Sequence, residues 1–74
     1  MKQKAELTTK IQLKNKTSIT TISFFGNTKS NVMEKIIRHI YDCGWEFTGS
    51  EEQHFLTQGY YISPDKEVEF KVTF

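Results

Sequence analysis

The chain has 74 residues, a formal net charge of +1, and an aromatic content of 14%. A chain of this length forms one domain and buries about 60–65% of the surface that its unfolded form exposes, so its margin of stability is small. Its single cysteine excludes an internal disulfide and fits a reducing compartment. With no basic-then-apolar signal segment and no apolar run of about 20 residues, we expect a cytoplasmic protein that does not enter a membrane.

The first part of the chain is expected to form a β-hairpin. Residues 1–6 are charged and polar without a period, which predicts a frayed end. Residues 7–13 alternate apolar and polar side chains, as a strand with one buried face does. The stretch 14–17 is rich in turn-forming residues. A second strand is therefore expected to follow it.

This second strand, residues 18–25, is β-branched and aromatic, but its alternation is imperfect. Ile22 and Phe24 share one face, whereas Ile19 and Phe25 share the other. Either a bulge shifts the strand, or its second face is covered as well. The sequence alone leaves open which face is buried.

One amphipathic helix is expected between residues 30 and 44. Its apolar side chains fall within one arc of about 140°, with charged side chains on the opposite side. That arc comprises Val32, Met33, Ile36, Ile37 and Ile40. Asn31 followed by Glu34 predicts a capping box, with Ser30 as the competing cap, and Gly44 predicts the left-handed residue that ends a helix.

Three further strands are expected after the helix. The first spans residues 45–48, where Trp and Phe alternate with polar residues. We prefer a strand for residues 53–63, although Ser50 and Gly59 would also fit the cap and the stop of a short helical turn. Residues 67–74 show the cleanest alternation in the chain and form the last strand.

These elements predict an α+β fold in the order ββαβββ, with one antiparallel sheet of strand order 2-1-5-4-3 and one amphipathic helix on one face, in a single domain over residues 1–74. Two orders keep every adjacent pair antiparallel, 2-1-3-4-5 and 2-1-5-4-3, and the charges favour the second. Residues 1–30 carry six lysines and one glutamate, whereas residues 31–74 carry four basic and eight acidic residues. The first and last strands should therefore be neighbours, because opposite charges across strands stabilise a sheet. The expected pairs place Lys10 or Lys14 opposite Glu67 or Glu69.

The segment from Met33 to Phe47 consists of a helix, then Gly44-Trp45-Glu46, then a strand. In this it resembles a group of small uncharacterised bacterial domains. The resemblance implies a compact helix-on-sheet fold and carries no activity, ligand or catalytic residue. Trp45 directly follows the glycine stop, so we expect it to turn back against Ile40 and Tyr41 and to anchor the core.

His39 and Cys43 lie four residues apart on the expected helix, a spacing that lets two side chains share a metal ion. A structural zinc site needs four ligands, and His54 is the one other histidine or cysteine. As a nucleophile, Cys43 lacks an evident orienting group, and a cysteine at the apolar edge of a helix is normally inert. We therefore expect no metal, no cofactor and no enzymatic activity.

Binding to another protein, or to a second copy as a homodimer, is the function that we expect. The chain contains more large apolar residues than one helix on one sheet face can hide. The residues expected to reach the other face and bind a partner are Ile19, Phe25, Tyr60 and Tyr61. A compact intracellular regulator, such as the inhibitors that mobile elements encode, would have these properties.

Nucleic-acid binding is the alternative function. The N-terminal hairpin is basic, and its expected contact residues are Lys10, Lys14 and Lys16. Exposed aromatic residues on a sheet could also stack on bases. Against this reading, the chain has one arginine, an isoelectric point of about 7.9 and no recognised nucleic-acid-binding signature.

Overall fold

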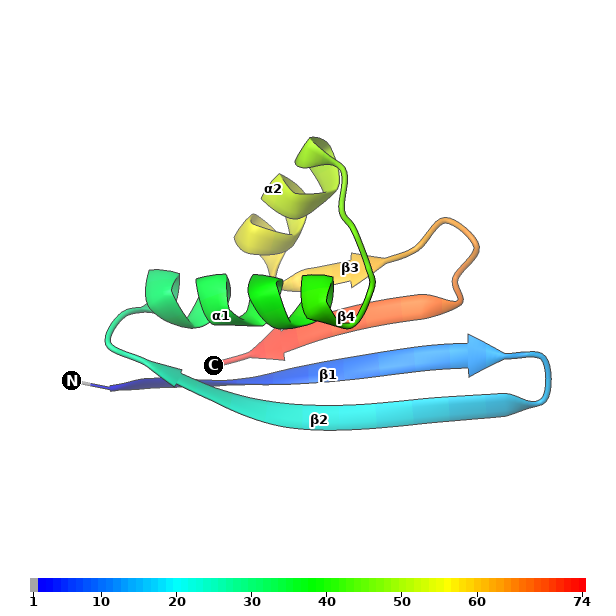
Figure 1. Ribbon diagram of the computed structural model, residues 1–74, viewed down its shortest axis with the longest axis horizontal. Coiled ribbons are helices and arrows are strands. Elements are labelled where there is room, and N and C mark those ends of the chain that lie inside the picture. The colour runs from blue at the N-terminus through cyan, green and yellow to red at the C-terminus, as the bar shows by residue number, and fades with distance from the viewer. Residues whose placement is uncertain (1) are drawn as a thin grey trace.

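The computed structural model describes residues 2–74. Its elements are β1 (Gln3–Leu13), β2 (Lys16–Gly26), α1 (Lys29–Asp42), α2 (Gly49–Gln58), β3 (Tyr60–Ile62) and β4 (Val68–Thr73). The fold is α+β, with one antiparallel sheet of strand order β2-β1-β4-β3 and both helices on the same face (Figure 1). Neither helix in this part of the chain is long and apolar enough to cross a membrane.

The predicted five-stranded order ββαβββ is wrong, because residues 45–48 form no strand and a second helix follows them. This helix, Gly49–Gln58, also replaces the first part of the strand expected over residues 53–63, of which Tyr60–Ile62 remains as β3. Thr48 caps α2: its hydroxyl accepts the Glu51 N–H at 3.2 Å, and the Glu51 carboxylate accepts the Thr48 N–H at 2.8 Å. This reciprocal capping box satisfies two backbone donors that a helix start leaves unpaired. Gly59 ends the helix with φ of 68°. The alternative of a helical turn before Gly59 was therefore correct in type, with Thr48 as the cap in place of Ser50.

The predicted neighbours in the sheet are confirmed. β1 pairs with β4 in an antiparallel register that places Lys10 opposite Glu69. Removing the incorrect strand from the expected order leaves the observed order of the other four. The opposite charges of the first and last strands therefore predicted a true pairing.

The N-terminal end is more ordered than expected. β1 begins at Gln3, and Ala5 is fully buried, so the frayed end predicted for residues 1–6 is wrong from Gln3 onward. Met1 lies outside the described residues. The extra length arises because β2 is long enough to pair with β1 as far as Gly26.

The helix α1 buries the predicted face and begins two to three residues earlier than predicted. Val32, Ile36 and Ile40 are fully buried in the core. Its N-cap is Thr28, whose hydroxyl accepts the backbone N–H of Asn31 at 3.1 Å, so the predicted caps Ser30 and Asn31 lie inside the first turn. At the other end, Gly44 has φ of 97°, which confirms the predicted left-handed stop.

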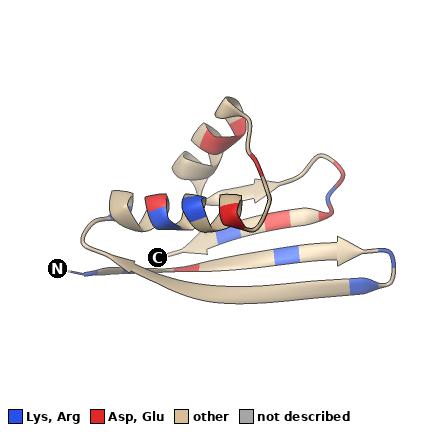
Figure 2. Ribbon diagram, in the orientation of Figure 1, with Lys and Arg blue, Asp and Glu red and all other residues tan. Residues whose placement is uncertain are grey.

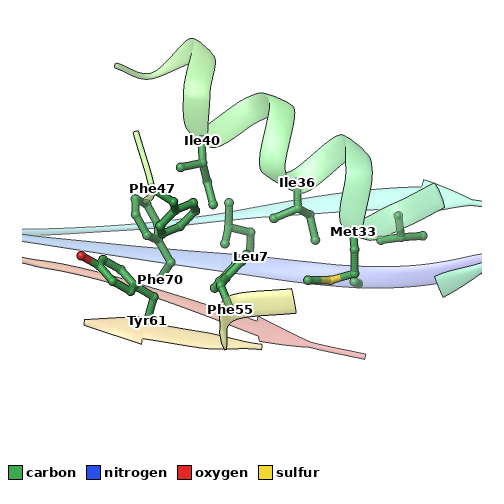
Figure 3. Packing of buried hydrophobic residues seen from close by; sticks show 10 residues of the cluster. Leu7, Met33, Ile36, Ile40, Phe47, Phe55, Tyr61 and Phe70 are labelled. Atoms are coloured by element: carbon green, nitrogen blue, oxygen red, sulfur yellow. The ribbon is translucent and has the colours of Figure 1, made fainter. Parts of the chain in front are cut away.

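The core between the helices and the sheet combines aliphatic side chains of α1 and β1 with four aromatic side chains (Figure 3), which are Phe47, Phe55, Tyr61 and Phe70. Phe47 stacks on Phe55 with ring centroids 5.3 Å apart. Trp45 is partly buried; its ring lies 5.9 Å from Tyr61 and 6.2 Å from Phe70. Its backbone N–H donates to the carbonyl of Ile40 at 3.3 Å, which confirms that the chain turns back onto the end of α1. The ring itself packs toward the sheet, against Tyr61 and Phe70, where packing against Tyr41 was expected.

Candidate interaction surface

The sheet face that points away from the helices, here called the far face, carries three of the four predicted partner residues. The register of β1 and β2 runs without interruption from Gln3 opposite Gly26 to Leu13 opposite Lys16, so no bulge re-aims β2. Ile22 and Phe24 therefore face the helices, while Ile19 and Phe25 lie on the far face. Ile19 is 64% exposed and Phe25 is 50% exposed.

Tyr61 does not belong to this surface, so its assignment as a partner residue is wrong. It points to the helix side and is 6% exposed, whereas its neighbour Tyr60 points to the far face. The Tyr61 hydroxyl donates to the Glu51 carboxylate at 2.8 Å. Burial, followed by this hydrogen bond, raises the pKa of Tyr61 to about 12. The residue thus links the start of α2 to β3.

The far face does not form one apolar patch, because charged strands divide it. β1 and β4 lie between β2 and β3, and Lys10 stands opposite Glu69 in their register. Three strand spacings separate β2 from β3, about 14 Å. Tyr60 also donates its hydroxyl to Glu69 at 2.8 Å. The β2 side, with Ile19 and Phe25, is therefore a surface separate from the β3 side.

The backbone of β2 is the feature that the sequence reading missed. The Gln12 N–H donates to the Glu67 carbonyl at 2.7 Å, so even-numbered residues of β1 point to β4 and odd-numbered ones to β2. By the same alternation, the even-numbered residues of β2 point to β1. The N–H and C=O groups of its odd-numbered residues then point outward. These residues, here called the β2 edge, are Thr17, Ile19, Thr21, Ser23 and Phe25.

A side chain of α1 gives independent support for this orientation. The Lys35 ammonium donates to the backbone carbonyl of Phe25 at 2.6 Å, which requires that carbonyl to point away from β1. Lys35 therefore covers one end of the β2 edge. The remainder of the edge carries no charge: the twelve residues 17–28 include no Lys, Arg, Asp or Glu. Figure 2 shows β2 without charge along almost its whole length. This uncharged run is the feature of the sequence that could have indicated an unprotected edge strand.

The distal half of the hairpin extends past the helical layer (Figure 1). Leu13 is 59% exposed although it follows the apolar alternation of β1. Of the three predicted nucleic-acid contacts, Lys14 and Lys16 lie at the turn of this hairpin, while Lys10 lies on the far face beside Glu69. The structure therefore does not gather the three lysines into one patch of uniform charge.

A cleft of about 360 Å³ lies between the end of α1 and the helix-facing side of the hairpin. Its lining includes Ile11, Ile22, His39, Cys43 and Trp45. Cys43 Sγ lies 3.5 Å from His39 Nε2. Within residues 2–74, no group of three or more His, Cys, Asp or Glu side chains is placed to hold a metal ion, and His54 lies elsewhere, beside Tyr60 and Ile62.

Comparison with known protein families, with curated proteins and with solved structures finds no match to this chain. The interpretation of its function therefore rests on the surface itself.

Proposed function

We propose that this protein is a non-catalytic protein-interaction module that binds its partner through the β2 edge, by adding a strand of the partner to its own sheet. The observation that carries this proposal is the eleven-residue edge strand with an uncharged run over residues 17–28. Proteins normally protect a strand of this length with charges, prolines, bulges or a covering segment. In this protein the protection is limited to the Phe25 end of the β2 edge, where Lys35 binds the carbonyl.

Backbone and side chains of the β2 edge would make different contributions to such a complex. The outward N–H and C=O groups would form the main-chain hydrogen bonds that give affinity in strand addition. The far-face side chains would contribute selectivity, because Ile19 and Phe25 are the two large apolar residues of the row, with the small hydroxyl residues Thr21 and Ser23 between them. A partner strand with apolar residues at matching positions would therefore be preferred.

Nucleic-acid binding is the second candidate, supported by the exposed lysines at the hairpin turn. Lys14 and Lys16 are exposed at the turn between β1 and β2, and this end of the hairpin extends past the helices (Figure 1). However, Lys10 has Glu69 as its neighbour, so the positive potential on the far face is reduced. Phosphate binding also requires basic groups, and the β2 edge offers none between residues 17 and 28. These features favour a protein partner.

The experiment is capture from a native lysate of the source cells, with protein and nucleic acid both identified in the eluate. Thr21→Pro tests the edge: proline lacks the outward N–H, while the bonds from β2 to β1 remain. Thr21→Val is the matched control, because it keeps the N–H and also loses the hydroxyl contact of Thr21 with Thr8. We expect proteins that the wild type and Thr21→Val retain and that Thr21→Pro loses.

A second arm separates the two candidate functions. The triple variant Lys10→Ala, Lys14→Ala, Lys16→Ala should retain the same proteins if the β2 edge is the binding site. Nucleic acid that the wild type captures, that moderate salt releases and that the triple variant fails to hold would overturn the proposal in favour of phosphate binding.

A further inference from the structure

We infer that the partner of the β2 edge is a second copy of this chain, paired antiparallel about a two-fold axis at Ile22, so that two four-stranded sheets become one sheet of eight strands. This inference rests on the proposed function and adds the identity of the partner and the register. Its basis is that the edge is complementary to itself in backbone direction, in side chains and in charge.

The backbone direction permits self-pairing. In an antiparallel pair, residues with outward N–H and C=O groups exchange both hydrogen bonds with a residue of the same kind on the other strand. A two-fold axis at a residue pairs odd-numbered positions with odd-numbered positions, which are the outward-pointing positions of the β2 edge. With the axis at Ile22, Ile19 meets Phe25 of the second copy, and Thr21 meets Ser23 of the second copy. All of these residues lie within the observed strand.

The side chains select this register over its neighbours. Ile19 and Phe25 are the large exposed apolar residues of β2 on the far face, and they are 64% and 50% exposed. An axis at Ile22 places each of them opposite the other, twice in the dimer. An axis at Thr21 would place Ile19 opposite Ser23 and Phe25 opposite Thr17. An axis at Ser23 would place Phe25 opposite Thr21. Aromatic and β-branched residues in direct cross-strand pairs stabilise a sheet, so the axis at Ile22 is preferred.

The charges around the edge do not oppose this pairing. The register within one copy places Lys10 beside Ile19 and Lys4 beside Phe25. In the dimer, Lys10 and Lys4 of the second copy would lie on strands separated by three spacings, about 14 Å. This separation exceeds the screening length of about 10 Å at 0.1 M salt. Within one copy, the Lys4 ammonium lies 6.0 Å from the centre of the Phe25 ring. The lysines therefore border the apolar pair without repelling each other across it.

Lys35 is compatible with the second strand. Its ammonium donates to the Phe25 carbonyl, and a carbonyl oxygen has two lone pairs. The same oxygen can therefore also accept the N–H of Ile19 from the second copy. Because the axis runs perpendicular to the sheet, the helices of both copies lie on the same side, and the joined far faces remain continuous.

The test is the mass of the purified protein in solution over a wide concentration series, at low and moderate salt. We expect a monomer–dimer equilibrium that changes little with salt, persists in Thr21→Val, and is lost in Thr21→Pro with an unchanged circular dichroism spectrum. If Thr21→Pro fails to fold, Ile19→Lys replaces it, because the substitution removes the apolar side chain opposite Phe25 and adds a charge to the β2 edge between Lys10 and Lys4 of the second copy. A wild type that stays monomeric at all concentrations overturns the inference. So does a dimer that persists in the folded variant.

The register has its own test by disulfide trapping in a Cys43→Ser background. Residues in a hydrogen-bonded antiparallel pair have Cα atoms about 5.5 Å apart, within the range that a disulfide bridges. Mixing the Ile19→Cys and Phe25→Cys proteins under mild oxidation should give a cross-linked dimer. The mixture of Thr17→Cys and Phe25→Cys, which an axis at Thr21 would pair, should not. Cross-linking of the second mixture in place of the first overturns the register.

These outcomes distinguish the inference from the proposed function. One outcome is a monomeric wild type that still captures proteins, which Thr21→Pro loses and Thr21→Val keeps. This outcome excludes a second copy as the partner and supports strand addition by another protein. If Thr21→Pro keeps both the captured proteins and the dimer, the proposed function and the inference are both overturned.

Discussion

At one edge of the sheet β3 spans three residues, between a glycine that ends α2 and a proline-containing turn, whereas at the other edge β2 runs for eleven residues. The β3 edge lies close to the aromatic part of the core: Tyr61 packs on Phe70, and α2 directly precedes the strand. The strand β2 pairs with β1 on one side. On its other side the backbone points outward, and residues 17–28 provide no charged side chain to protect it. A short edge resists further pairing, while a long and uncharged one offers a template for it. We therefore expect the β3 side to contribute mainly to stability, whereas the β2 side carries the proposed interaction.

Among the changes considered, Phe55→Ala should lower the free energy of unfolding the most, and it lies on the β3 side. Phe55 is fully buried and is the one buried residue of α2, with its ring stacked on Phe47. Removal of a buried aromatic side chain costs about 3–5 kcal/mol of unfolding free energy, which is a large part of the stability of so short a chain. Chemical denaturation followed by circular dichroism should therefore show a strongly destabilised or unfolded protein. Leu56→Ala, on the exposed side of the same helix, is the control and should shift the midpoint little.

Two adjacent proline substitutions test the backbone orientation assigned to β2. Thr20→Pro removes an N–H that points to β1 and leaves the carbonyl it bonds unpaired, whereas Thr21→Pro removes an outward N–H. An unsatisfied hydrogen-bonding group costs about 1–3 kcal/mol, so Thr20→Pro should be less stable than Thr21→Pro by roughly that amount. The unfolding free energies should be compared at low protein concentration, where self-pairing contributes least. Equal destabilisation by the two substitutions would contradict the assigned backbone orientation.

A smaller effect is expected at the junction between α2 and β3. Gly59 has φ of 68°, and its carbonyl accepts the N–H of Val72 at 2.7 Å. A side chain in the left-handed region costs about 1–2 kcal/mol, so Gly59→Ala should lower the unfolding free energy by that amount. Gly49→Ala is the matched control: it lies in the first turn of α2 with φ outside the left-handed region and with open space around it, and should be neutral or stabilising. A neutral Gly59→Ala would contradict the observed helix stop.

The smallest effect concerns the pH dependence of the β3 side. Burial raises the pKa of Tyr61 to about 12, so the folded state favours the protonated phenol. This contribution to stability is complete below the ordinary tyrosine pKa of 10 and is lost as the pH rises from 10 to about 12. Tyr61→Phe should lose the hydrogen bond to Glu51, about 1 kcal/mol at neutral pH, and should then decline less steeply than the wild type between these pH values. An identical alkaline slope in both proteins would contradict the raised pKa.

Much of the fold was predictable because its signals are local. The apolar arc of α1 and the left-handed Gly44 follow from side-chain spacing and from backbone sterics within one segment. The pairing of β1 with β4 followed from charge, since Lys10 and Glu69 stand on strands of opposite net charge.

The second helix was missed for a physical reason. Of its ten residues, only Phe55 is buried, so α2 has almost no helical period in its apolar residues. Its signal was the capping box of Thr48 and Glu51, which lies between the two strands expected over residues 45–48 and 53–63. Helices that bury one residue are stabilised by their caps and by tertiary packing, and periodicity does not detect them.

The candidate surface divides in the same way. The sequence by itself determined that β2 is a strand, that Ile19 and Phe25 share a face opposite to that of Ile22 and Phe24, and that residues 17–28 carry no charge. Only the tertiary structure decided which of those faces the helices cover, that Tyr61 points into the core, and that the backbone of β2 lies at an edge. Alternation along a strand arises from the local geometry of the chain. Coverage and edge position depend on contacts between residues far apart in sequence, such as those of β1 with β4 and of α1 with β2.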